Sequence, residues 1–192
     1  MRGTDGLAAP AQQVPLQTIQ ANNDRLRQLF TANYPLVWRL LRRLGVRADG
    51  IEDAAQQVFL IVAERLPDIR EGSERSFIYG TALRIATGYR RRRERERLGC
   101  SLDEGIRSPL PTPSELTDQR RARLVLDWVL SKMQEDLRTV FVLFEIEGFT
   151  TAEISGLVGV PQGTTASRLR RARESFRRLV RRAMGPSSDS PW

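Results

Sequence analysis

Apolar side chains recur at three- and four-residue steps in the first half of the chain, which is the period of a helix with one buried face. Three such stretches begin near Asp24, Ile51 and Ser73, and Pro35 is expected to kink or divide the first of them. They predict a three- or four-helix bundle over residues 23–98. In the second and third helices, the positions expected to face its core are Ile51, Ala54, Ala55, Val58, Phe59, Val62, Phe77, Ile78, Thr81, Ala82, Ile85, Ala86 and Tyr89.

The pattern stops at residues 99–118, which contain three prolines within five positions and predict a flexible linker. Apolar periodicity resumes after it and predicts a second helical domain at residues 119–184, followed by a tail at 185–192. Residues 1–22 show no sustained period, so we expect a flexible extension without a secretory signal. The predicted fold is all-α, with two small helical domains joined by a linker.

The second domain contains the signature of a helix-turn-helix. Thr150 and Glu153 have the spacing of a capping box, Gly159 supplies a sharp turn, and Pro161 suits the first turn of a long arginine-rich helix. That helix can enter the major groove of DNA and contact base edges and phosphates. The candidate DNA contacts near its N-terminal end are Gln162, Thr164, Ser167, Arg168 and Arg171.

Charge supports a polyanionic partner. The chain has a net charge of +8, with seven arginines and two glutamates in residues 76–98 and eight arginines and one glutamate in residues 162–183. Two basic blocks separated by an acidic stretch indicate two contacts with nucleic acid, although solvated arginine faces would give the same composition. There is no histidine and one cysteine, so we expect no enzyme activity, no metal and no cofactor. No apolar run is long enough to span a bilayer, which favours a cytoplasmic protein with no membrane partner.

Residues 147–173 read EGFTTAEISGLVGVPQGTTASRLRRAR. This stretch resembles the fourth conserved region of extracytoplasmic-function (ECF) sigma factors. Upstream, LFTANYPLVWRLLRRL, IEDAAQQVFLIVAERL and SFIYGTALRIATGYRRRR are similar to the second region of the same family. The resemblance implies a sigma factor that binds core RNA polymerase and directs it to promoter DNA, and it suggests an anti-sigma factor as a further partner.

Particular residues follow from that resemblance. Asp53, Gln56, Gln57 and Phe59 fall on the motif that binds core polymerase, although Phe59 fits a core position equally well. The loop from Pro67 to Arg75 matches the loop that holds a flipped base of the −10 element. Candidate contacts to the melted −10 strand are Phe77, Tyr79, Arg84, Tyr89, Arg90 and Arg91. The resemblance also implies that the DNA contacts listed above for the last helix, Gln162, Thr164, Ser167, Arg168 and Arg171, read the −35 element.

A helix-turn-helix regulator that does not associate with core polymerase is the alternative. It would explain the second basic block and leave the segment from Ile51 to Arg93 without a role. An enzyme is a more distant reading, because the sequence contains no P-loop, dinucleotide fingerprint or metal-ligand cluster.

Overall fold

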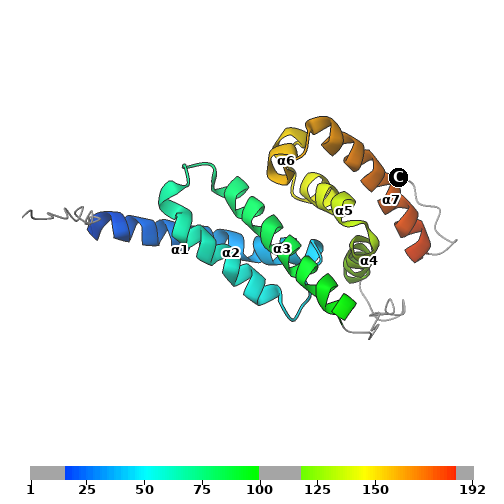
Figure 1. Ribbon diagram of the computed structural model, residues 1–192, viewed down its shortest axis with the longest axis horizontal. Helices are drawn as coiled ribbons and strands as arrows, with labels where there is room; N and C mark the ends of the chain where they lie inside the picture. Colours follow the sequence, from blue (N-terminus) through cyan, green and yellow to red (C-terminus); the bar gives the residue numbers. More distant parts are fainter. Residues whose placement is uncertain (1–15, 100–117, 185–192) are drawn as a thin grey trace, which may run out of the picture.

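The computed structural model describes residues 16–99 and 118–184, which contain helices and turns and no strand. Two helical units lie side by side, one built from α1, α2 and α3 and the other from α4 to α7 (Figure 1). The predicted linker, apart from Gly99 and Asp118, lies outside the described residues, as do residues 1–15 and 185–192. The elements are α1 (Leu16–Arg43), α2 (Ile51–Arg65), η1 (Leu66–Asp68), α3 (Glu74–Gly99), α4 (Asp118–Lys132), α5 (Glu135–Phe141), η2 (Val142–Ile146), α6 (Thr151–Val158) and α7 (Gln162–Met184).

Helix α1 corrects two expectations. It begins at Leu16, so residues 16–22, predicted as part of a flexible extension, are helical. It also continues through Pro35, so the expected division of the helix is wrong, and a kink at that residue stays a prediction. The missing amide of Pro35 costs one backbone hydrogen bond, and the apolar face on both sides of it offsets that loss by packing on α2 and α3.

The core of the first unit follows the predicted periodicity. All six apolar positions predicted for α2 are buried, and they pack against Val37, Leu40, Leu41 and Leu44 of α1. In α3 the predicted positions Ile78, Thr81, Ala82 and Ala86 are buried, whereas Phe77, Ile85 and Tyr89 are only partly covered. The small bundle therefore forms as the helical pattern predicts.

The second unit contains the predicted helix-turn-helix as α6 and α7. The Thr150 hydroxyl accepts from the Glu153 backbone amide at 3.3 Å, and the Glu153 carboxylate accepts from the Thr150 amide at 2.7 Å, which completes the capping box. Gly159 ends α6 in the left-handed region at φ 71°, a conformation that favours glycine. The Ser155 hydroxyl donates to the Val160 carbonyl at 2.6 Å and ties the turn together. Pro161 precedes α7, and its carbonyl accepts from the Thr165 amide.

The two units pack against each other through α3, which contacts α6, and through α1, which contacts α4, and their buried apolar side chains form one continuous cluster. Tyr79 and Leu83 of α3, which were not among the predicted core positions, are buried because this helix has a second covered face. Gly80 lies on that face, where an added Cβ would stand 3.4 Å from the side chain of Leu157 in α6. Within residues 16–99 and 118–184, no helix combines the length and the apolar character needed to cross a membrane.

Candidate nucleic-acid interface

A groove of about 760 Å³ runs between α1 and α2 on the first unit. Its floor is aromatic: the ring of Phe59 packs edge-on against Phe30 with centroids 4.9 Å apart, and Tyr34 lies 5.0 Å from Phe30. Its rim is polar, with Asp53 and Gln56 exposed beside the aromatic rings. An aromatic and aliphatic floor with a polar rim is typical of a protein-binding surface.

Three of the four predicted polymerase-binding residues line this groove, namely Asp53, Gln56 and Phe59. Gln57 is exposed on α2 outside it. Sequence reasoning missed Phe30 and Leu60, which are 44% and 56% exposed. An apolar Leu60 outside the buried stripe of α2 was the available signal, because a large apolar side chain on the solvent face of a helix has no packing role.

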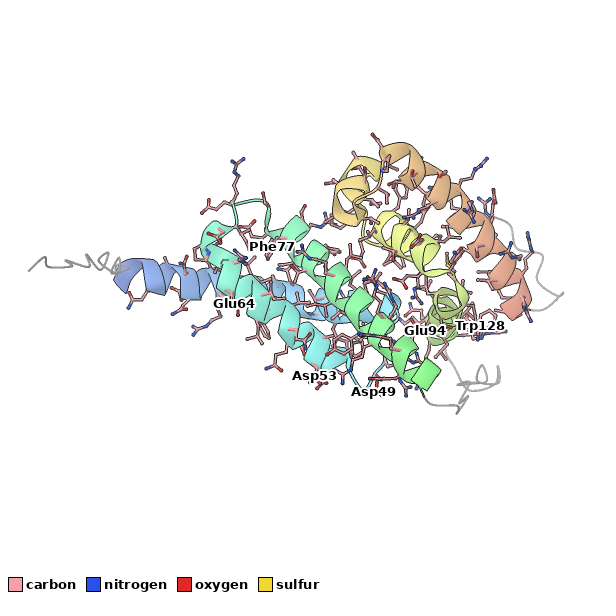
Figure 2. All side chains as sticks on the ribbon, viewed as in Figure 1. Asp49, Asp53, Glu64, Phe77, Glu94 and Trp128 are labelled. Carbon is pink, nitrogen blue, oxygen red and sulfur yellow. The ribbon has the colours of Figure 1, made fainter. Side chains whose placement is uncertain are left out.

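A second cavity, of about 630 Å³, lies between the end of α2, the following loop and the start of α3. The predicted residues Phe77 and Arg84 line it, together with Arg65 and Arg70, which the sequence did not single out. Figure 2 labels Phe77 on α3, next to the loop that closes the cavity. Apolar walls with several guanidinium groups around them suit a base and its phosphate.

Arg25 of α1 holds the loop that shapes this cavity. Its guanidinium donates to the backbone carbonyls of Leu66 and Ile69 and to the Glu74 carboxylate, the last at 2.6 Å. The hydrogen bond from Arg25 holds the pKa of Glu74 below its usual value. One side chain therefore fixes both ends of the loop from Pro67 to Arg75.

Two of the predicted −10 contacts are covered by the second unit. Tyr79 is fully buried, with its hydroxyl donating to the Glu147 carboxylate at 2.7 Å and its ring edge-on to Phe149. Burial, followed by the hydrogen bond to Glu147, raises the pKa of the Tyr79 hydroxyl above its usual range. Arg90 donates to the Leu44 carbonyl and to Glu135.

The remaining −10 candidates lie along the same helix. Arg91 is exposed, and Tyr89 is half-buried with its ring against Gly50, where an added Cβ would stand 2.9 Å from a ring carbon. Burial is the main cause of the raised pKa of the Tyr89 hydroxyl, and the nearby carboxylate of Asp53 raises that pKa further. Tyr89 therefore packs on the turn before α2, the helix that carries the groove residues.

The predicted −35 contacts gather at the N-terminal half of α7. Gln162, Ser167 and Arg171 are exposed, and Thr164 and Arg168 are half-buried. Arg168 is ion-paired with Asp136 of α5 at 2.7 Å, so part of its binding capacity is already occupied. Thr164, Ser167, Arg168 and Arg171 follow at three- and four-residue steps on one face of the helix after the turn at Gly159, as a base-reading helix requires. Gln162, the first residue of α7, lies off that face, and its side-chain amide donates to the Thr151 hydroxyl at 3.2 Å.

Comparison with known proteins assigns both units. The family model described as sigma-70 region 2 matches residues 29–96, and the one described as sigma-70, region 4 matches residues 123–176. The ECF RNA polymerase sigma factor SigE of Mycolicibacterium smegmatis is 28% identical over 143 residues, 73% of this chain and 56% of that protein. The ECF RNA polymerase sigma-E factor of Escherichia coli K12 is 24% identical over 174 residues, 85% of this chain and 91% of that protein. The chain belongs to the ECF sigma factor family.

Solved structures support the fold of this ECF sigma factor. The sigma factor RpoE of Bartonella quintana, in complex with the anti-sigma factor NepR, matches with a TM-score of 0.67 and 20% identity over 81% of this chain and 96% of that one. CnrH, in complex with the cytosolic domain of CnrY, matches with a TM-score of 0.61 and 21% identity over 85% and 92% of the two chains. The match between the present chain and SigE of Mycolicibacterium smegmatis spans little more than half of the length of SigE.

Proposed function

We propose that this protein binds core RNA polymerase and directs it to a two-part promoter. The observation that carries the proposal is the presence, in one chain and in the order of the family, of a region 2 match and a region 4 match. The protein supplies the promoter address and assists strand opening, while nucleotide chemistry stays with the polymerase. It acts in the cytoplasm, where that enzyme works.

The groove between α1 and α2 is the proposed polymerase contact. Phe59 forms its floor with Phe30, and Asp53 and Gln56 supply polar contacts at its rim. A buried aromatic anchor surrounded by polar groups is the arrangement in which a few residues carry most of the binding energy. Gln57, exposed one position further along α2, extends the same contact.

The cavity beside α3 is the proposed site for a base of the −10 element. Phe77 offers a ring for stacking and Arg84 a cation for the backbone, while Arg25 holds the loop in shape. Extraction of a base costs a few kcal/mol of stacking, so a preformed pocket lowers the cost of strand opening. Tyr79, Tyr89, Arg90 and Arg91 are the further candidates along the path of the melted strand.

An anti-sigma protein is a proposed second partner. Two solved structures of similar fold are the sigma factor RpoE in complex with the anti-sigma factor NepR, and CnrH in complex with the cytosolic domain of CnrY. A partner of that kind is expected to compete with core polymerase for this chain.

Run-off transcription with core enzyme tests the proposed function. We expect the purified chain to form a complex with core polymerase, and the mixture to produce specific transcripts from a randomised promoter library. A chain that binds DNA without retaining core polymerase would instead be a regulator of the alternative class.

Replacing Arg171 with alanine is expected to weaken binding of the upstream promoter element by about 1–3 kcal/mol, because an exposed arginine in the N-terminal half of the reading helix can contact a guanine edge. Arg168→Ala should cost a similar amount once Arg168 leaves Asp136. Arg178→Ala, exposed on the same helix further from its start, is the control and should leave sequence preference unchanged. Binding curves over a set of single-base promoter variants measure the affinity and the sequence preference of each protein variant. If both Arg168→Ala and Arg171→Ala keep the wild-type sequence preference, α7 does not contact DNA bases through this face.

A further inference from the structure

Arg25 of α1 connects a third helix to both sides of the loop that forms one wall of the cavity beside α3. Its guanidinium donates to the Leu66 carbonyl at 3.4 Å, to the Ile69 carbonyl at 2.9 Å and to the Glu74 carboxylate at 2.6 Å. The three acceptors lie 41, 44 and 49 positions further along the chain. One side chain thus links the end of α2 and the start of α3 to α1.

The acceptors of Arg25 belong to the cavity wall or adjoin it. Ile69 lines the cavity, and Glu74 directly follows Ser73, which lines it too. Arg25 is not among the lining residues. It therefore acts on the contents of the cavity through the loop and not by direct contact.

The hydrogen bonds within the loop are local. The Ile69 amide donates to the Leu66 carbonyl at 3.3 Å, and the Ser73 amide donates to the Arg70 carbonyl at 3.0 Å. Each of them closes a turn of four residues and leaves the position of that turn relative to α3 undetermined. Around Gly72, at φ +83°, an added Cβ would meet no atom within 4 Å, so side-chain packing does not hold the second turn. The position of the loop therefore depends on contacts from outside it.

Arg25 is well suited to supply that contact. A guanidinium carries several donors in a fixed planar fork, so it can bind two carbonyls and a carboxylate at once. The side chains of Arg25 and Glu74 are only 24% and 18% exposed, which shields their ion pair from water. The next residue, Leu26, packs against the core and fixes this part of α1. The guanidinium therefore starts from a well-anchored backbone.

We propose that Arg25 is a positioning residue for recognition of a −10 base: its three hydrogen bonds hold the loop from Pro67 to Arg75 in the shape that accepts the base. The inference rests on the proposed function, in which this cavity takes that base. Without the guanidinium the loop samples several shapes, and ordering it again on binding lowers the affinity for the base. The loss falls on the base and leaves contacts to the DNA backbone unchanged.

Holoenzyme assembled from the full chain and core polymerase tests this proposal. The probes are single-stranded oligonucleotides that carry the −10 element, each with one abasic nucleotide. In the parent, one abasic position should cost far more affinity than its neighbours. In Arg25→Gln the cost at that position should shrink by about 10-fold, a factor that one hydrogen bond to a charged group can supply, and the cost at the other positions should stay the same.

Arg39→Gln is the matched control, because Arg39 is an exposed arginine on the same helix. It removes the same charge and should keep the abasic profile of the parent. Glu74→Gln removes the partner on the loop and should reduce the same cost, and its effect should not add fully to that of Arg25→Gln in the double variant. Equal changes in Arg25→Gln and Arg39→Gln, or a parental profile in Arg25→Gln, overturn the proposal.

Hydrogen exchange on the free chain gives a second readout. Residues 68–75 of Arg25→Gln should exchange about 10-fold faster than in the parent, while the buried part of α2 keeps its protection and shows that the fold is intact. Unchanged exchange in the loop overturns the proposal. If Arg25→Gln loses protection throughout, Glu74→Gln takes its place, and a parental loop and abasic profile in that variant overturn the proposal.

The two readouts separate this inference from the proposed function. Exchange in the free chain needs no polymerase, so it tests the hold of Arg25 on the loop even if the chain forms no holoenzyme. A parent holoenzyme in which no abasic position stands out would instead contradict the assignment of the cavity to a base.

Discussion

Replacing Leu60 with glutamate is expected to lower the affinity for core RNA polymerase by about 30-fold or more. Leu60 is 56% exposed and lines the groove beside Asp53, Gln56 and Phe59. A glutamate there would place an unpaired carboxylate in the interface next to Asp53. Burial of an unpaired charge costs at least about 2 kcal/mol, which corresponds to that factor.

The fold should tolerate this change. Leucine and glutamate have similar helix propensities, and substitutions at exposed positions away from special features usually alter stability by less than about 0.5 kcal/mol. Circular dichroism and the midpoint of thermal unfolding check this, and titration of labelled chain with core enzyme measures the affinity.

Met184→Glu is the matched control, because Met184 is a large apolar side chain of comparable exposure, 44%, on the other unit. The Met184→Glu variant should bind core polymerase with the affinity of the parent, because Met184 does not line the groove. An equal loss in both variants would show a general effect of added negative charge. Wild-type affinity in Leu60→Glu would place the polymerase contact elsewhere on the chain.

Replacing Leu41 with alanine is expected to lower the free energy of unfolding by about 2–5 kcal/mol. Leu41 is fully buried at the centre of the first unit, where α1 packs on α2 and α3. The cost combines the lost transfer energy of the deleted carbons with the cavity that they leave. Urea denaturation followed by circular dichroism measures the change.

Leu60→Ala deletes the same atoms from an exposed position and is the control for this second prediction. It should cost less than about 1 kcal/mol, because its side chain gains little from burial in the free protein. Similar losses at both positions would contradict the packing of α1 described here. Because the chain has two units, the urea curve should also be tested for a second transition.

The local features of this protein were readable from short stretches of sequence. The capping box at Thr150 and Glu153 involves residues three positions apart, and the left-handed turn at Gly159 depends on the absence of its own side chain. The buried stripe of α2 follows from a 3.6-residue period. In each case the interacting groups belong to the same few turns of chain, so the local pattern is sufficient.

Helix limits were less certain from sequence. Residues 16–22 carry little periodic signal, yet α1 includes them, and Pro35 lies inside the helix because packing outweighs one lost hydrogen bond. The π-helical turn η2, which brings Glu147 and Phe149 to the first unit, had no signal in the periodic pattern. The turn contains the buried residues Val142 and Leu143, so its geometry depends on how these two side chains pack in the core.

The sequence alone determined the helical class, the two basic blocks and the family resemblance, because periodicity, composition and motif spacing are properties of the linear chain. Only the tertiary structure decided that α3 is buried on two faces, that Arg25 reaches Ile69 and Glu74, and that Glu147 meets Tyr79. These partners lie 44, 49 and 68 positions apart in the chain. Their meeting depends on how whole helices pack, and no periodicity within one helix encodes which surface of another helix will cover it.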